Sequence, residues 1–109
     1  MTKLLSSLVA AATLLAAAPS FADTWAENHP RRAEVNGRLA NQNQRVNAGV
    51  RDGQLSHHQA AQLHREDHAI RTEERAMAAE HGGHITKGEQ RQLNRQENTV
   101  SRQIHRERH

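Results

Sequence analysis

The sequence has no cysteine and no tyrosine, and its 109 residues include one tryptophan, one phenylalanine and two prolines. Without cysteine, the chain has neither disulfide bonds nor thiolate metal sites. Nucleic-acid binding is not expected despite a net charge of +3, because stacking aromatics are scarce and arginines are interspersed with glutamates. The sequence also lacks HExxH, a nucleophile motif and a glycine-rich phosphate loop, so we do not expect an enzyme.

The one long apolar run lies at the amino terminus. Lys3 precedes an apolar stretch from Leu4 to about Ala18, and small residues follow up to Ala22. This order is typical of a secretory signal peptide over residues 1–22, with cleavage after Ala22. The run is shorter than the roughly 20 residues of a membrane span, and no second candidate follows it. We therefore expect a periplasmic or secreted protein with no membrane span in the mature chain.

Apolar side chains are few beyond that run. The eleven Leu, Ile and Val residues of the mature segment make up about 13% of it, below the roughly 20% at which highly charged chains become disordered. The net charge is small, however, so the composition indicates a mixed-charge chain that is marginal as a monomer. Thin apolar stripes gain most by pairing with a second copy, which predicts a homodimer.

A stretch of sequence is repeated after thirty residues, first as DGQLSHHQAAQLHREDHAI from Asp52 and then as GGHITKGEQRQLNRQENTV from Gly82. In each copy a glycine, Gly53 or Gly83, suits the left-handed position just past a helix end. Ser56-x-x-Gln and Thr86-x-x-Glu are capping boxes, which begin helices. The repeat of about thirty residues therefore predicts two helix-loop-helix junctions.

Three helices follow from a shared pattern in which a leucine precedes a β-branched residue by seven positions. The pattern occurs as LANQNQRV from Leu39, LHREDHAI from Leu63 and LNRQENTV from Leu93. Residues at this spacing share one helical face. We predict an all-α protein with three amphipathic helices, forming a small antiparallel bundle or an extended hairpin. The helices cover residues 31–50, 56–79 and 86–107 of a helical domain at 31–109, after a loose arm at 23–30.

Polar residues stand between the apolar ones on each stripe: Gln42 and Asn43, Glu66 and Asp67, Gln96 and Glu97. One interpretation is a partly wet or hydrogen-bonded layer that fixes the register of the helices. The other is that Asp67 and Glu97 face one another as metal ligands or as carboxylates that share a proton.

Nine histidines make the chain histidine-rich. Two pairs are spaced four residues apart, so that both rings of a pair lie on one helical face and can chelate a divalent ion. Another histidine precedes the first pair by two turns, and an aspartate adjoins that pair. The predicted metal ligands are His57, His64, Asp67, His68, His105 and His109. Imidazole and carboxylate ligands favour zinc, copper(II), nickel or cobalt; the alternative is that the histidines decorate solvated faces.

The two helix starts, LSHHQ at residues 55–59 and ITKGE at residues 85–89, resemble the paired LTxxQ motifs of the Spy/CpxP family. That family comprises small, exported, all-helical proteins associated with envelope stress, which hold unfolded chains or sense metals such as zinc. The resemblance covers ten residues. It implies either a periplasmic chaperone for unfolded proteins or a metal-responsive stress protein.

The junctions also resemble degenerate EF-hands. The sixth, eighth and twelfth loop positions are matched twice, by Gly53, Leu55 and Gln59 and by Gly83, Ile85 and Glu89. Calcium requires oxygen ligands at positions one, three and five, where the two loops together hold only the carboxylates of Asp52 and Glu80. We expect the helix-loop-helix geometry without tight calcium binding.

These features together predict a non-enzymatic exported protein of the bacterial envelope that binds divalent transition-metal ions, in metal homeostasis or the stress response. One alternative is a Spy-like chaperone that holds unfolded chains, and another is a structural or interaction module without a metal role. Metal capture should weaken as histidines protonate near pH 6, whereas a holding surface should be insensitive to chelators.

Overall fold

The computed structural model describes residues 21–109, so the predicted signal peptide lies outside the described residues except for its last two. The regular structure of the described residues is entirely helical and includes no strand, which confirms the all-α prediction. None of its helices is long and apolar enough to cross a membrane. The helices are α2 (Phe21–Asn28), α3 (Pro30–Arg51), α4 (His57–Glu80) and α5 (Lys87–Arg108).

The described residues form four helices where the sequence predicted three, and the additional one is α2. It covers most of the segment at 23–30 that we expected to be a loose arm. Ring contacts join this segment to the rest of the molecule: Trp25 stacks on His29, and His29 stacks on His84, each with centroids 4.7 Å apart. Because the second of these contacts spans 55 positions of the sequence, helical periodicity could not reveal it. Pro30 then begins α3, where its missing N–H costs no hydrogen bond.

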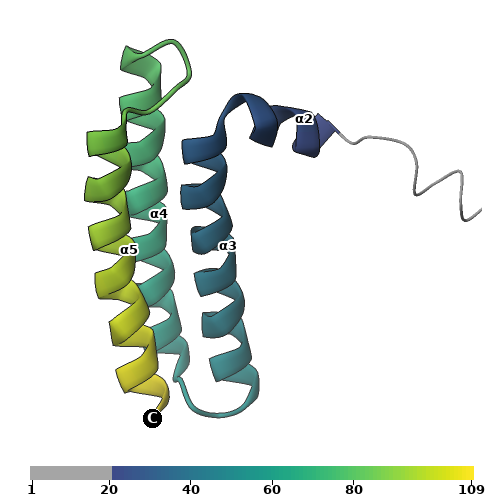
Figure 1. The fold of residues 1–109 in the computed structure, drawn as a ribbon. Coiled ribbons are helices and arrows are strands. Elements are labelled where there is room, and N and C mark those ends of the chain that lie inside the picture. The colour runs from purple at the N-terminus through teal and green to yellow at the C-terminus, as the bar shows by residue number, and fades with distance from the viewer. Residues whose placement is uncertain (1–20) are drawn as a thin grey trace, which may run out of the picture.

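The bundle consists of α3, α4 and α5, which lie side by side, while α2 projects sideways from the beginning of α3, away from α4 and α5 (Figure 1). Each of the three packs against the other two, and α2 contacts α3 alone among the helices. Short loops at residues 52–56 and 81–86 connect the helices of the bundle. Successive helices are therefore antiparallel, and the end of α4 lies beside the beginning of α5.

The core follows from the spacing of buried residues, which is three or four positions at every step along each helix of the bundle. That spacing keeps one stripe facing the neighbouring helices. The buried apolar residues are Val35, Leu39, Val46, Leu55, Ala60, Leu63, Ile70, Ala78, Ile85, Leu93, Val100 and Ile104, with Val50 and Met77 packed against them. All eleven Leu, Ile and Val side chains of the described residues thus lie in or against one core within a single chain. The homodimer stays a prediction.

Both predicted capping boxes are present. The Ser56 hydroxyl accepts from the Gln59 N–H at 3.0 Å, and the Gln59 side chain accepts from the Ser56 N–H at 2.9 Å. The Thr86 and Glu89 pair repeats these bonds at 3.1 and 2.9 Å. The two predicted glycines have φ angles of +75° and +94°, which confirms the left-handed positions after α3 and α4.

Four polar side chains are buried in this core: Gln42, Asp67, Glu74 and Glu97. Three of them belong to the predicted polar stripe and come from α3, α4 and α5, and none is more than 3% exposed. The Gln42 side chain donates to the Glu97 backbone carbonyl at 2.8 Å and so links α3 to α5. One polar residue of each predicted pair is therefore excluded from solvent, whereas the other residue of each pair, Asn43, Glu66 or Gln96, is half-buried.

Candidate metal centre

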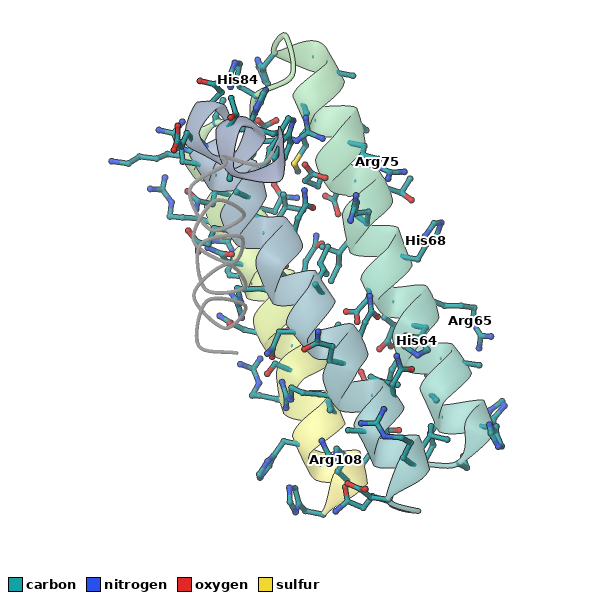
Figure 2. The ribbon with its side chains drawn as sticks, turned by 90° about the vertical axis from the view of Figure 1, so that its right-hand side faces the viewer. His64, Arg65, His68, Arg75, His84 and Arg108 are labelled. Carbon is teal, nitrogen blue, oxygen red and sulfur yellow. The ribbon has the colours of Figure 1, made fainter. Side chains whose placement is uncertain are left out.

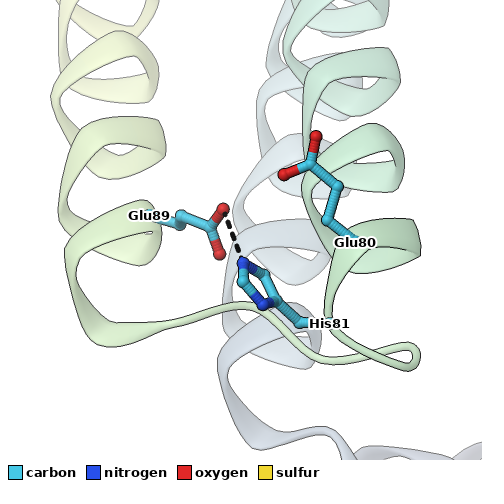
Figure 3. Close-up of side chains that lie close together, drawn as sticks. All are labelled: Glu80, His81 and Glu89. Carbon is cyan, nitrogen blue, oxygen red and sulfur yellow. Dashed lines mark ion pairs between the residues drawn. The ribbon is translucent and has the colours of Figure 1, made fainter.

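Three side chains converge where α4 ends and α5 begins (Figure 3). Glu80 is the last residue of α4, His81 follows it, and Glu89 lies in the first turn of α5. One ligand atom from each lies within 4.8 Å of the other two. Within the part of the chain that the structure describes, this is the one group of three histidine or acidic side chains with ligand atoms so close.

The capping box orients the Glu89 carboxylate. One oxygen, Oε1, accepts from the Thr86 N–H at 2.9 Å, and the other, Oε2, lies 3.5 Å from His81 Nε2. The hydrogen bond from the Thr86 backbone lowers the pKa of Glu89 below its ordinary value of 4.5, and the Thr86 hydroxyl and His81 act in the same direction. The carboxylate is therefore charged at neutral pH and held in place by the helix start.

The electrostatics of the group favour a cation. With a neutral imidazole it carries the two negative charges of Glu80 and Glu89, and the carbonyl groups at the end of α4 add partial negative charge. The side chain of His81 is 44% exposed and that of Glu89 is 19% exposed, so an ion has access from solvent. One imidazole nitrogen and two carboxylate oxygens suit zinc or cobalt and leave a fourth coordination position for water.

The predicted group of His64, Asp67 and His68 lies near the middle of α4. The two ring nitrogens of His64 lie 2.9 Å from Asn43 Oδ1 and 3.1 Å from Asn47 Oδ1, both on α3. An ion that coordinates His64 has to displace one of these amides. His68 is exposed (Figure 2). These three side chains do not bring their ligand atoms within 4.8 Å of one another in the described structure.

Asp67 itself is only 2% exposed, and neither of its carboxylate oxygens has a hydrogen-bond partner among the described residues. Burial raises its pKa from 3.8 to about 6; the charge of Glu66 adds to this rise and that of Arg45 opposes it. A metal ligand has to be deprotonated. Asp67 would thus bind a metal ion most readily at a pH above about 6, where its carboxyl group is deprotonated.

Asp67 and Glu97 interact electrostatically across the bundle. That they act as metal ligands or share a proton stays a prediction. Burial raises the pKa of Glu97 from 4.5 to about 7; Arg38 lowers it, whereas Asp67 and Glu34 raise it further. The guanidinium of Arg38 lies 3.6 Å from Glu97 Oε1. Two neighbouring buried carboxyl groups with raised pKa values favour a layer that retains protons near neutral pH.

The remaining predicted ligands lie at helix ends. His57 is exposed at the first position of α4. His105 and His109 lie near the carboxyl terminus, where their rings have centroids 4.5 Å apart and are tilted by 44°. These histidines do not join a group of three ligand atoms in the described structure. Metal binding by them stays a prediction.

The sequence marked two members of the convergent group without bringing all three together. Glu80 and Glu89 occupy the third and twelfth positions of the second EF-hand-like loop, but the scarcity of other carboxylates there argued against calcium. Reading His81 as a third ligand would have required knowing that the loop returns α5 beside the end of α4. The sequence pattern that could have indicated this group is Glu80-His81 at the end of one helix, followed by a capping box whose last residue is the acidic Glu89.

No known protein family, curated protein or solved structure matches this chain. The resemblance of residues 55–59 and 85–89 to the Spy/CpxP motifs therefore stays a prediction. What the described residues do show is that both stretches form the helix starts that the resemblance requires. Function is therefore inferred from the chemistry of the convergent side chains.

Proposed function

We propose that this protein is a non-enzymatic metal-binding protein of the bacterial cell envelope, which holds a divalent transition-metal ion through Glu80, His81 and Glu89. The observation that carries the proposal is the approach of one nitrogen and two oxygen ligand atoms to within 4.8 Å of one another. Zinc is the leading candidate, because its protein ligands include imidazole and carboxylate in tetrahedral sites. Copper(II), nickel and cobalt are the other candidates.

The distribution of apolar side chains favours metal binding over the chaperone alternative. A surface that holds unfolded chains requires a contiguous exposed apolar patch. Among the described residues, the exposed large hydrophobic side chain is Trp25, at 37%. Its ring stacks on His29, and the Arg32 guanidinium lies 5.2 Å from the ring centroid. The exposed apolar surface around α2 is therefore small and already in contact with other side chains.

An ion at this position would connect two helices. Glu80 and Glu89 belong to α4 and α5, and the loop between them contains two glycines with positive φ, Gly82 and Gly83. A ligand that binds only the folded chain stabilises it in proportion to the logarithm of its concentration. Metal binding should therefore raise the melting temperature by holding the α4–α5 junction together.

The test is calorimetric titration of the purified protein with zinc, copper(II) and nickel. His81→Ala should weaken zinc binding at least about tenfold, because it removes one of three ligands. Glu89→Gln should also weaken binding while preserving the helix start, because glutamine fills the same capping position in the first junction. Affinity should fall between about pH 7.5 and 5.5 as imidazole protonates.

Two control variants locate the site. His58→Ala removes an exposed histidine of the first junction and should leave zinc affinity unchanged. His64→Ala/His68→Ala tests the pair predicted from the sequence. Loss of zinc binding in this double variant, together with full binding by His81→Ala, would place the metal at the middle of α4. Equal small losses for every histidine removed would indicate nonspecific surface coordination and overturn the proposed function.

A further inference from the structure

A groove of about 610 Å³ runs between α3 and α4, apart from the α4–α5 junction. Its α3 side is lined by Leu39 and by short side chains, among them Ala40 and Asn43. Its α4 side carries longer side chains that are cationic or become cationic on protonation. The short side chains of α3 leave the space of the groove open. The cationic side chains of α4 make the groove suited to a negatively charged ligand.

The α4 side presents His64, His68, Arg71 and Arg75, all of which line the groove. They stand at positions i, i+4, i+7 and i+11, which lie on one face of a helix. Figure 2 shows His64, His68 and Arg75 following one another along α4. At a rise of 1.5 Å per residue, the row is about 16 Å long.

The two arginines of this row form no ion pair in the described structure. The arginine ion pairs there join Arg32, Arg38 and Arg108 to acidic side chains, and neither Arg71 nor Arg75 takes part in one. Like charges four residues apart on a helix repel. Arg71 Nε is in addition buried without a hydrogen-bond partner among the described residues, and an unpaired buried donor is unfavourable.

The neighbouring α3 side chains supply further donors. The side-chain amides of Asn43 and Asn47 both lie within hydrogen-bond distance of the His64 ring. A neutral imidazole donates through one nitrogen and accepts through the other, so at least one of the two amide NH₂ groups is left as a donor toward the groove. The acidic side chain that lines the groove, Asp67, is 2% exposed. Guanidinium and amide donors together match the oxygens of an anion, and the planar guanidinium fork binds phosphate with two parallel hydrogen bonds.

We propose that the α3–α4 groove binds a linear polyanion built of linked phosphate groups. One phosphate can neutralise one or two guanidinium groups, whereas a row of about 16 Å accommodates several anionic groups in succession. A chain of linked phosphates is favoured over a polycarboxylate because a single bridging oxygen separates successive phosphates, which places more negative charge along the row. Each internal phosphate keeps two unbridged oxygens for the guanidinium fork. The proposal does not depend on the metal site, because the groove and the candidate metal centre share no residue. Arg71 and Arg75 would also repel a cation and attract an anion.

The experiment compares binding of linear inorganic polyphosphate, inorganic phosphate and poly-glutamate to the purified protein by calorimetry, with EDTA present so that no metal bridges the partners. Arg71→Gln/Arg75→Gln should weaken polyphosphate binding at least about tenfold. The plot of log affinity against log salt concentration should also become shallower, its slope decreasing in magnitude by about 2. The reason is that the double variant neutralises two phosphates fewer than the wild type. Arg75→Gln alone, at an exposed position, should produce part of both effects.

Arg91→Gln/Arg95→Gln is the matched control, because it removes the same charge at the same spacing from exposed positions of α5 that do not line the groove. It should retain wild-type affinity and salt dependence. Equal losses in the two double variants would show general charge attraction and overturn the proposal. Equal affinity for polyphosphate and for poly-glutamate of the same length would also overturn the proposal. Binding of inorganic phosphate as tightly as polyphosphate would overturn it as well.

Discussion

Asp67 and Glu97 are ordinary carboxyl groups whose surroundings alter their protonation. Both lie on the apolar stripe that the sequence indicates, and the structure buries them to 2% and 0% exposure. The sequence could place polar residues on the stripe, because helical spacing is local. It could not decide whether the layer is wet or dry, because that depends on how closely three helices approach.

The two raised pKa values predict that stability falls as the pH rises. Burial raises the pKa of Asp67 to about 6 and that of Glu97 to about 7, against ordinary values of 3.8 and 4.5. Between about pH 4 and 7 the folded chain therefore binds more protons than the unfolded chain, and its stability decreases through this window as the pH rises. Across this window each carboxyl group lowers the free energy of unfolding by on the order of 1–3 kcal/mol.

Glu97→Gln isolates this effect, because an uncharged amide resembles the protonated acid. The variant should melt above the wild type at about pH 8, where the wild-type carboxylate is charged, and close to it at about pH 5. Glu27→Gln, which removes an exposed charge on α2, should shift the melting temperature little at either pH. A Glu97→Gln shift of the same size at both pH values would contradict the assignment of the titration to this residue.

At the level of the helices, start and stop positions are the best predicted features. The predicted helices at 31–50, 56–79 and 86–107 correspond to Pro30–Arg51, His57–Glu80 and Lys87–Arg108. Agreement within one residue at the two junctions follows from the local character of the signals used there, the capping boxes and the left-handed glycines. The short α2 was not predicted. The ring of His29, which follows α2, stacks on His84, and local patterns in the sequence do not reveal a contact between such distant residues.

Gly49 marks another feature that required the structure. A Cβ atom on this buried residue would lie 2.6 Å from Leu55 Cδ1, so the end of α3 and the first loop can approach only because the residue has no side chain. The Gly49 carbonyl also accepts from the N–H groups of Gln54 and Leu55, at 2.8 and 3.0 Å. Local patterns in the sequence indicate Gly53 at this junction but not Gly49, because a close approach leaves no such pattern.

The candidate metal centre has the ligand types that the sequence indicated, but it is formed by other residues than those predicted, and metal binding by the predicted ones stays a prediction. The choice of imidazole and carboxylate ligands followed from the absence of cysteine. The choice of the His64 and His68 pair followed from helical spacing, which cannot foresee that Asn43 and Asn47 of α3 face one of those rings. The candidate centre depends on contacts between helices, and a single sequence contains little information about such contacts.

The capping boxes give a prediction for the α4 start. Ser56→Ala removes the hydroxyl that accepts from the Gln59 N–H, and should lower the free energy of unfolding by about 0.5–2 kcal/mol. Ser56→Asp should retain most of the stability, because a carboxylate accepts the same bond. Urea denaturation followed by circular dichroism measures both. A Ser56→Ala protein as stable as the wild type would mean that this cap contributes nothing to the fold.

At the scale of the whole molecule, Arg32 joins parts that are distant in the sequence. Its side chain pairs with Glu74 on α4, donates to the Gly83 carbonyl at 3.0 Å, and lies 5.2 Å from the Trp25 ring centroid. One residue of α3 thus contacts α2, α4 and the second loop. Glu74 is completely buried, so this ion pair carries a charge into the core.

Breaking the pair should be more damaging than replacing it. Arg32→Met leaves the Glu74 carboxylate buried without its partner and should cost on the order of 3 kcal/mol of stability. Arg32→Met/Glu74→Leu removes both charges and should recover most of that loss, as measured by urea unfolding at about pH 7.5. A double variant no more stable than Arg32→Met would show that packing around Arg32, rather than the uncompensated charge, determines the effect.

The ring stack at the end of the bundle gives the molecule an optical probe of its own. Trp25 is the one tryptophan in the chain, and through His29 it is connected to His84, three residues beyond His81. Indole emission is sensitive to whatever surrounds the ring. The fluorescence spectrum of the unlabelled protein therefore reports on the same loop that carries the candidate metal centre, with no other tryptophan contributing background.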